Sequence, residues 1–177
     1  MADLETAPVT TTSPDQEQQL SPKRWIALTV ILVAAFMDML DSTILNVTVP
    51  SIQRHLGSTY AQVQWITAGY QIAFALLLIL GGRLGDIYGR KRIFQLGVLG
   101  FTLASILAAA SQNSGTLIVA RLVEGGFAAV MVPQVLAIIH VSFPPQERAK
   151  AFGMFGMVAG LAAISGLSLG GLLVQWN

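Results

Sequence analysis

Four ionisable side chains lie inside long apolar segments of this sequence. Asp38 and Asp41 are three residues apart in one segment, and Arg121 and Glu124 have the same spacing in another. Residues three apart lie on one face of a helix. A charged side chain at the centre of a bilayer costs on the order of 2.5–3.5 kcal/mol, so such residues typically bind protons, contact a substrate or form ion pairs.

The depths of these residues predict that they meet. If both segments cross a membrane, Asp41 and Glu124 lie about nine and about eight residues from the same side, which is nearly one level at 1.5 Å per residue. We therefore predict a cluster in which Asp41 or Glu124 binds and releases a proton as its pairing with Arg121 changes. Asp38 is a further candidate for proton or substrate binding. The structural alternatives are a static Arg121–Glu124 pair, and hydrogen bonds between the two aspartates and a neighbouring helix.

The elements that position these residues follow from composition. Hydrophobic residues make up 54% of the 177 positions, charged residues 11%, and the mean hydropathy is +0.65, whereas soluble domains carry about 25% charged residues. We predict an all-α membrane protein with five transmembrane helices of about 20 residues or more, at residues 25–50, 61–81, 93–111, 116–139 and 151–174. Residues 1–22 are rich in Thr, Ser, Pro and Gln, which predicts a disordered cytoplasmic tail.

Several kinds of chemistry are excluded by residue counts. The sequence has no cysteine and two histidines, so a disulfide framework, a thiolate metal site and a cysteine nucleophile are ruled out. Neither a nucleophile and base set nor metal-ligand spacing is present. We expect no enzyme activity, no cofactor or metal ion, and no nucleic-acid partner.

The distribution of basic residues predicts the orientation in the membrane. Excess Lys and Arg mark the cytoplasmic side. They precede the first span and follow the second and fourth, at Lys23, Arg24, Arg83, Arg90, Lys91, Arg92, Arg148 and Lys150. We predict a multi-pass protein of a plasma membrane, most simply a bacterial cell membrane, with a cytoplasmic N-terminus and the lipid bilayer as its surroundings.

Glycines in the fifth span predict close helix packing. Gly156 and Gly160 form one pair at four-residue spacing, Gly166 and Gly170 form another, and Gly171 lies beside them. Small residues at this spacing let helix backbones approach each other.

The segment 82–92 between the second and third spans is charged and rich in glycine. We expect Gly82 and Gly89 to permit a tight turn, and Asp86 to accept hydrogen bonds from backbone N–H groups at a helix start. Arg90 and Lys91, with Arg92, can pair with Asp86, with another helix end or with anionic lipid. The alternative is an ordinary cationic anchor at the cytoplasmic side.

These segments resemble motifs of the major facilitator superfamily. The pattern G-x-L-a-D-x-x-G-R-K/R between the second and third helices is filled by Gly82, Leu84, Asp86, Gly89, Arg90 and Lys91. The stretch 41–47 with Pro50 resembles L-D-x-T-I-V-N-V-A-L-P of the fourteen-helix drug:proton antiporters, the EmrB/QacA-like branch. Arg121, Gly125, Ala128 and Ala129 resemble the R-x-x-Q-G motif, and 143–148 resembles the loop before the fifth helix.

The resemblance implies a rocker-switch transporter that exchanges external protons for cytoplasmic hydrophobic or cationic compounds, with the proton gradient as the energy source. By that likeness Asp41 is the coupling or substrate acid, Arg121 handles the proton, and Asp86 and Arg90 belong to a cytoplasmic latch. Glu124 stands where the family has Gln, and Leu167 stands where the antiporter motif has Pro.

The number of spans predicts only part of such a transporter. The superfamily builds each half from two repeats of three helices, and this sequence has five spans. We expect an N-terminal fragment, a partial N-terminal half whose C-terminal half is missing. The alternative is a non-transporting membrane fragment or an interaction protein.

Overall fold

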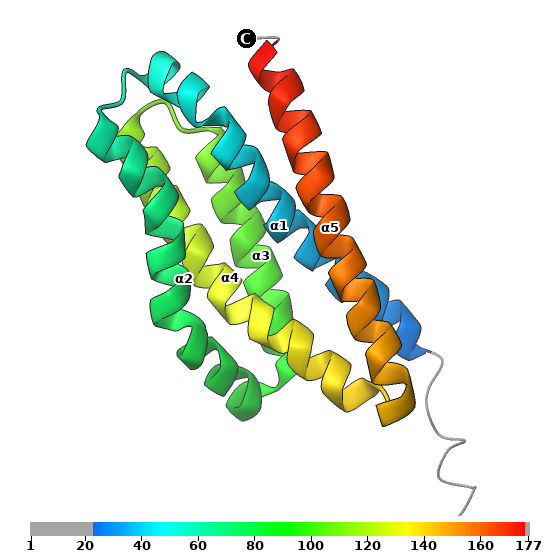
Figure 1. Cartoon of the computed structure of the whole chain (residues 1–177). Coiled ribbons are helices and arrows are strands. Elements are labelled where there is room, and N and C mark those ends of the chain that lie inside the picture. Colours follow the sequence, from blue (N-terminus) through cyan, green and yellow to red (C-terminus); the bar gives the residue numbers. More distant parts are fainter. Residues whose placement is uncertain (1–22, 176–177) are drawn as a thin grey trace, which may run out of the picture.

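The computed structural model describes residues 23–175, which form five α-helices (Figure 1): α1 Lys23–Leu56, α2 Tyr60–Tyr88, α3 Arg90–Ala109, α4 Ser114–Ser142 and α5 Pro145–Gln175. All five are long and apolar enough to cross a membrane, since a hydrocarbon core of about 30 Å needs roughly 20 helical residues. The predicted five-helix all-α membrane fold is confirmed. The predicted tail at residues 1–22 lies outside the described residues.

The helices run alternately up and down, so their connections gather at two ends of the bundle. The lower end in Figure 1 holds the start of α1, the α2–α3 turn and the α4–α5 turn, and the upper end holds the other two turns. At the upper end Thr59 and Gln62 form a capping box at the start of α2, and the Asn113 side chain accepts a hydrogen bond from the Thr116 N–H at the start of α4. These caps satisfy backbone donors that a helix start otherwise leaves free.

The helices differ in extent from the predicted spans. α2 continues through the segment predicted as a turn, so Gly82 lies inside the helix and Gly89 alone separates Tyr88 from Arg90. Gly89 has a φ of 93°, a left-handed conformation that glycine adopts easily. α1 passes through Pro50 to Leu56, and α3 ends at Ala109 rather than at 111. The predicted bounds followed apolar runs, whereas a helix extends past the hydrocarbon core where its charged residues reach water.

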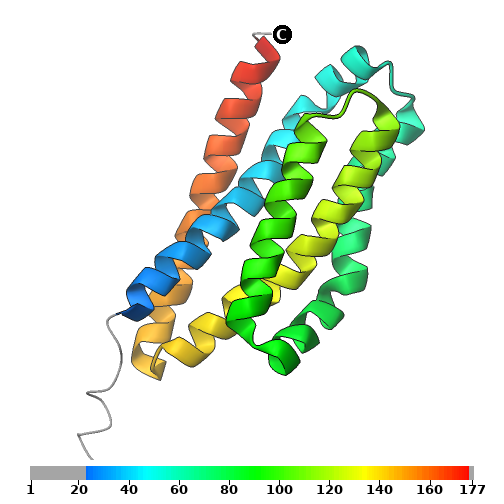
Figure 2. The same ribbon diagram turned by 180° about the vertical axis from the view of Figure 1, so that it is seen from behind.

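The bundle has two groups of helices that are visible from both sides (Figures 1 and 2). α4 packs extensively against α2 and α3, and α1 packs against α5. Glycines permit the close contacts within each group: Gly81 lies against the backbone of Ala129, Gly97 against Met131, and on α5 Gly166 against Thr43 and Gly170 against Val47. Contacts between the groups are fewer. We call this boundary between α1–α5 and α2–α3–α4 the seam.

Only part of the glycine prediction for the fifth span agrees with the structure. Gly166 and Gly170 contact α1, but a Cβ atom added at Gly156, Gly160 or Gly171 would meet nothing within 4 Å. The two pairs are ten residues apart, so at about 100° per residue the second pair is rotated roughly 80° from the first around the helix axis. The face with Gly156 and Gly160 therefore contacts no other described helix.

Candidate functional site

Arg121 lies at the centre of the seam and binds two carboxylates. Its Nη1 atom lies 2.6 Å from Oδ2 of Asp41 on α1 and 2.6 Å from Oε2 of Glu124 on its own helix. Arg121 is 3% exposed and Glu124 is 0% exposed, whereas the Asp41 side chain is 30% exposed. The predicted contact between the first and fourth spans is therefore present, and the static Arg121–Glu124 pair is not the whole arrangement.

A second contact across the seam involves Tyr70, a residue that sequence reasoning missed. The Tyr70 hydroxyl donates a hydrogen bond of 2.5 Å to Oδ1 of Asp38. The face of the same ring lies under Arg121, with the guanidinium carbon 4.8 Å from the ring centroid, an arrangement that favours a cation. Tyr70 on α2 thus contacts a group from α1 and a group from α4 at the same time.

Local packing explains how these side chains come together. Gly125, one turn after Arg121, lies directly against the backbone of Tyr70, where an added Cβ would come within 2.9 Å of the Tyr70 Cα. The small residue lets α4 approach α2 closely enough for the guanidinium to reach the ring. On the other side, the Ser105 hydroxyl of α3 donates to Oε1 of Glu124. All four helices α1 to α4 contribute to this cluster of Asp38, Asp41, Tyr70, Ser105, Arg121 and Glu124, which we call the seam cluster.

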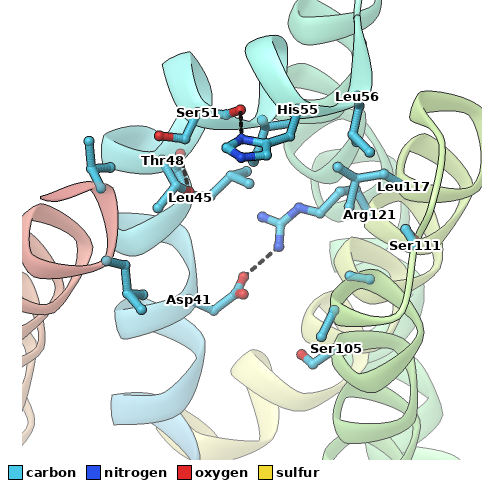
Figure 3. A pocket seen from close by; sticks show the side chains of 15 residues that line it. Asp41, Leu45, Thr48, Ser51, His55, Leu56, Ser105, Ser111, Leu117 and Arg121 are labelled. Carbon is cyan, nitrogen blue, oxygen red and sulfur yellow. Dashed lines mark hydrogen bonds and ion pairs between the residues drawn. The ribbon is translucent and has the colours of Figure 1, made fainter. Parts of the chain in front are cut away.

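A cavity of about 590 Å³ opens beside the Asp41–Arg121 pair. Figure 3 shows the two side chains pointing toward each other across it, with His55 nearer the upper end. The His55 Nδ1 atom lies 2.9 Å from the backbone oxygen of Ser51. The remaining polar side chains of the lining carry hydroxyl groups: Thr48, Ser51, Ser105 and Ser111. The Asp41 carboxylate thus faces a cavity that combines hydroxyl groups with apolar side chains.

A second cavity of about 460 Å³ adjoins Asp38 and has a different chemistry. Its walls combine the Asp38 carboxylate and the Ser42 hydroxyl with aromatic and thioether side chains. The rings of Tyr70 and Phe74 are stacked with their centroids 6.2 Å apart, and Phe155 and Met39 complete the apolar surface. Mostly apolar walls with one carboxylate suit an organic molecule, and a positively charged one in particular.

The seam cluster contains more negative than positive groups. Asp38, Asp41 and Glu124 supply three carboxyls and Arg121 supplies the one cation, so the cluster has a net charge of −2 when all three are ionised. Uncompensated charge in a low-dielectric interior is costly. The arrangement therefore favours the uptake of positive charge, either as protons or as a cationic ligand.

The second predicted site, at the α2–α3 turn, has a partly different geometry. Arg90 binds Asp86 at 3.1 Å and donates a hydrogen bond of 3.2 Å to the backbone oxygen of Ala137 on α4. Asp86 lies in the last turn of α2 and accepts from Arg90, so the expected acceptance from backbone N–H groups at a helix start was wrong. Lys91 is exposed, and Gly82 lies beside Pro133 of α4. Arg90 thus connects the turn to α4.

These features define a multi-pass membrane protein with a buried, titratable ion cluster in its helical bundle. The sequence profile of the Major Facilitator Superfamily matches residues 31–177, and the chain belongs to this family.

Curated relatives of the chain carry names that refer to transport, resistance or export. It is 51% identical to a probable actinorhodin transporter of Streptomyces coelicolor over 86% of this chain and 26% of the relative. It is 48% identical to a puromycin resistance protein of Streptomyces alboniger over 88% of this chain and 31% of the relative. A tetracenomycin C resistance and export protein of Streptomyces glaucescens is 39% identical over 88% of this chain and 29% of the relative. The chain thus spans about a quarter to a third of the length of these relatives.

Proposed function

We propose that the protein exports hydrophobic or cationic small molecules across the membrane in exchange for protons. The observation that carries this proposal is the charge imbalance of the seam cluster, in which three carboxyls share one guanidinium. A site that needs positive charge can bind either a proton or a cation, and competition between the two is the basis of exchange. The relatives named for actinorhodin, puromycin and tetracenomycin C support drug-like organic substrates.

In this proposal the individual groups have different parts, which their geometry supports. Asp41 is partly exposed to the cavity of Figure 3 and accepts the proton there. Protonation removes its charge and weakens its hold on Arg121, which then relies on Glu124 alone among its carboxylate partners. Because Asp41 is on α1 and Arg121 on α4, the proton loosens a contact between the two groups of helices. Asp38 faces the second cavity and is the group that meets a cationic substrate.

The orientation and the latch belong to the same proposal. The cationic turn at Arg90 and Lys91 supports a lower end and an N-terminus in the cytoplasm. The bacterial organisms of the relatives support a bacterial cell membrane. Arg90 joins α2 and α3 to α4 through Asp86 and the Ala137 backbone. This lower-end contact stabilises one conformation of the transporter, as the resemblance implies.

The test uses the complete protein that contains these residues, reconstituted into liposomes. An imposed proton gradient is expected to drive transport of puromycin or of tetraphenylphosphonium, a lipophilic cation. The Asp41→Asn variant is expected to lose gradient-driven transport. Glu147→Gln is the same acid-to-amide change in the first turn of α5, and it alters an ion pair with Arg24 outside the seam cluster. This variant is expected to retain gradient-driven transport. Undiminished gradient-driven transport by Asp41→Asn, or no transport of either probe by the unaltered protein, would refute the proposal.

A further inference from the structure

The two aspartates of α1 open into different cavities although they are one helical turn apart. Asp41 and Arg121 line the cavity of about 590 Å³, and neither Asp38 nor Tyr70 does. Asp38 and Tyr70 line the cavity of about 460 Å³, and neither Asp41 nor Arg121 does. Arg121 and Tyr70 therefore line different cavities while they contact each other, at 4.8 Å from guanidinium carbon to ring centroid.

We propose that Tyr70 is the positioning residue that couples a proton on Asp41 to a cationic ligand on Asp38. This inference rests on the proposed function. It assigns to Tyr70 the link between proton binding at Asp41 and cation binding at Asp38. The ring of Tyr70 gives the guanidinium of Arg121 a favourable surface other than Asp41. The hydroxyl of Tyr70 is the group that occupies Asp38 when no ligand is bound.

The coupling follows from where the single positive charge of Arg121 is held. When Asp41 is ionised, Arg121 binds it at 2.6 Å, and the charge on Asp38 is available to a cation. When Asp41 is protonated, the attraction between it and Arg121 falls, and the guanidinium is held by the Tyr70 ring and Glu124. Its charge then acts on the Asp38 side of the cluster and disfavours a second cation there. Proton and ligand thus exclude each other.

The other titratable groups that the structure describes near the seam are Glu124 and His55. α3 contributes the Ser105 hydroxyl, and α5 contributes Phe155, Ala159 and Ala163, none of which titrates. Among the described residues that line the two cavities, His55 is the remaining titratable group, at the upper end and bonded to the Ser51 backbone. Glu124 is fully buried and touches Ser105 as well as Arg121.

Two substitutions separate the ring of Tyr70 from its hydroxyl. Tyr70→Phe keeps the ring under Arg121 and removes the hydrogen bond to Asp38. Tyr70→Leu removes both. Phe74→Leu is the matched control, because Phe74 lines the same cavity and stacks on Tyr70, whereas Tyr70 is the ring that contacts Asp38 and Arg121.

The readout is the binding of tetraphenylphosphonium to the purified complete protein in weakly buffered detergent, with the released protons counted. The unaltered protein and Phe74→Leu are expected to release protons on binding. Tyr70→Phe is expected to release the same number and to bind the cation about tenfold more tightly, because Asp38 has lost a competing donor. Tyr70→Leu is expected to bind the cation with proton release reduced about fivefold. An unchanged affinity in Tyr70→Phe, or full proton release in Tyr70→Leu, overturns the inference.

The same assay separates this inference from the proposed function. Proton release on binding does not depend on movement of the ligand across a membrane. Normal transport with full proton release by Tyr70→Leu refutes the role of Tyr70 and leaves the exporter proposal standing. An absence of gradient-driven transport in liposomes, with cation-linked proton release intact, refutes the exporter proposal and leaves the coupling at Tyr70 standing.

Discussion

The contact between Gly125 and Tyr70 makes a quantitative prediction about packing. In Gly125→Ala the new Cβ atom would come within 2.9 Å of both the Cα and the carbonyl carbon of Tyr70, and real Cβ atoms do not approach backbone so closely. α2 and α4 must therefore separate. Overpacking of this kind costs about 1–3 kcal/mol, which raises the equilibrium constant for unfolding between roughly fivefold and 150-fold.

The matched control is Gly160→Ala on α5. A Cβ atom there meets nothing within 4 Å, so no helix has to move. Alanine also favours a helix over glycine, but helices persist in the unfolded state of a membrane protein, so the gain is smaller than in water. We expect the free energy of unfolding of Gly160→Ala to differ from that of the unaltered protein by at most about 0.5 kcal/mol.

The assay is equilibrium unfolding in dodecylmaltoside micelles titrated with dodecyl sulfate. Trp25, one of three tryptophans in the sequence, contributes to the fluorescence signal, because its ring packs edge-on against Phe143 at 5.1 Å between centroids and loses that contact when the helices separate. We expect the free energy of unfolding of Gly125→Ala to be at least about 1 kcal/mol lower than that of Gly160→Ala. If the two variants agree within about 0.5 kcal/mol, the close approach of α4 to Tyr70 is not a determinant of the fold and the packing argument is wrong.

Three further predictions use the same titration or a transport assay. Gly89→Ala places an L-residue at a φ of 93° and should destabilise the protein by about 1–2 kcal/mol; an unchanged midpoint would contradict this. Arg121→Leu leaves Glu124 buried without its cation and should cost about 3–5 kcal/mol, most of which a second change, Glu124→Leu, should restore; a double variant as unstable as the single one would count against it. Asp86→Asn breaks a pair whose acid is 66% exposed, so stability should change by less than about 1 kcal/mol while transport by the complete protein falls; equal transport would argue against a latch.

The contact between Asp41 and Arg121 could be predicted because its signal is present in the sequence itself. Charges inside apolar runs are costly, and their distance from the span ends fixes their depth to within a turn. The C-terminal end of α2 could not be predicted in this way. Residues 82–88 are charged and contain glycine, which is typical of a loop, yet they remain helical because Gly81 and Gly85 pack closely on α4. Sequence patterns within one segment do not show which glycines another helix covers.

Tyr70 illustrates a different limit. It lies among Ala, Gly, Gln and Ile, where a tyrosine is typical of an ordinary packing or interfacial position. Its importance comes from two partners, Asp38 and Arg121, that are 32 and 51 positions away in the chain. Only the arrangement of three helices shows that one ring touches both. The sequence showed Gly125 only as part of a motif, and the structure adds that this glycine contacts the Tyr70 backbone.

The one-residue connection at Gly89 also limits how the two helices that it joins can move in a bilayer. Tyr88 ends α2 and Arg90 begins α3, so the end of one helix and the start of the other lie at the same depth. A shift of either helix along the membrane normal carries the other with it, and a hydrocarbon core of about 30 Å must match both at once. Gly89 therefore makes α2 and α3 a single hairpin in any vertical movement of the bundle.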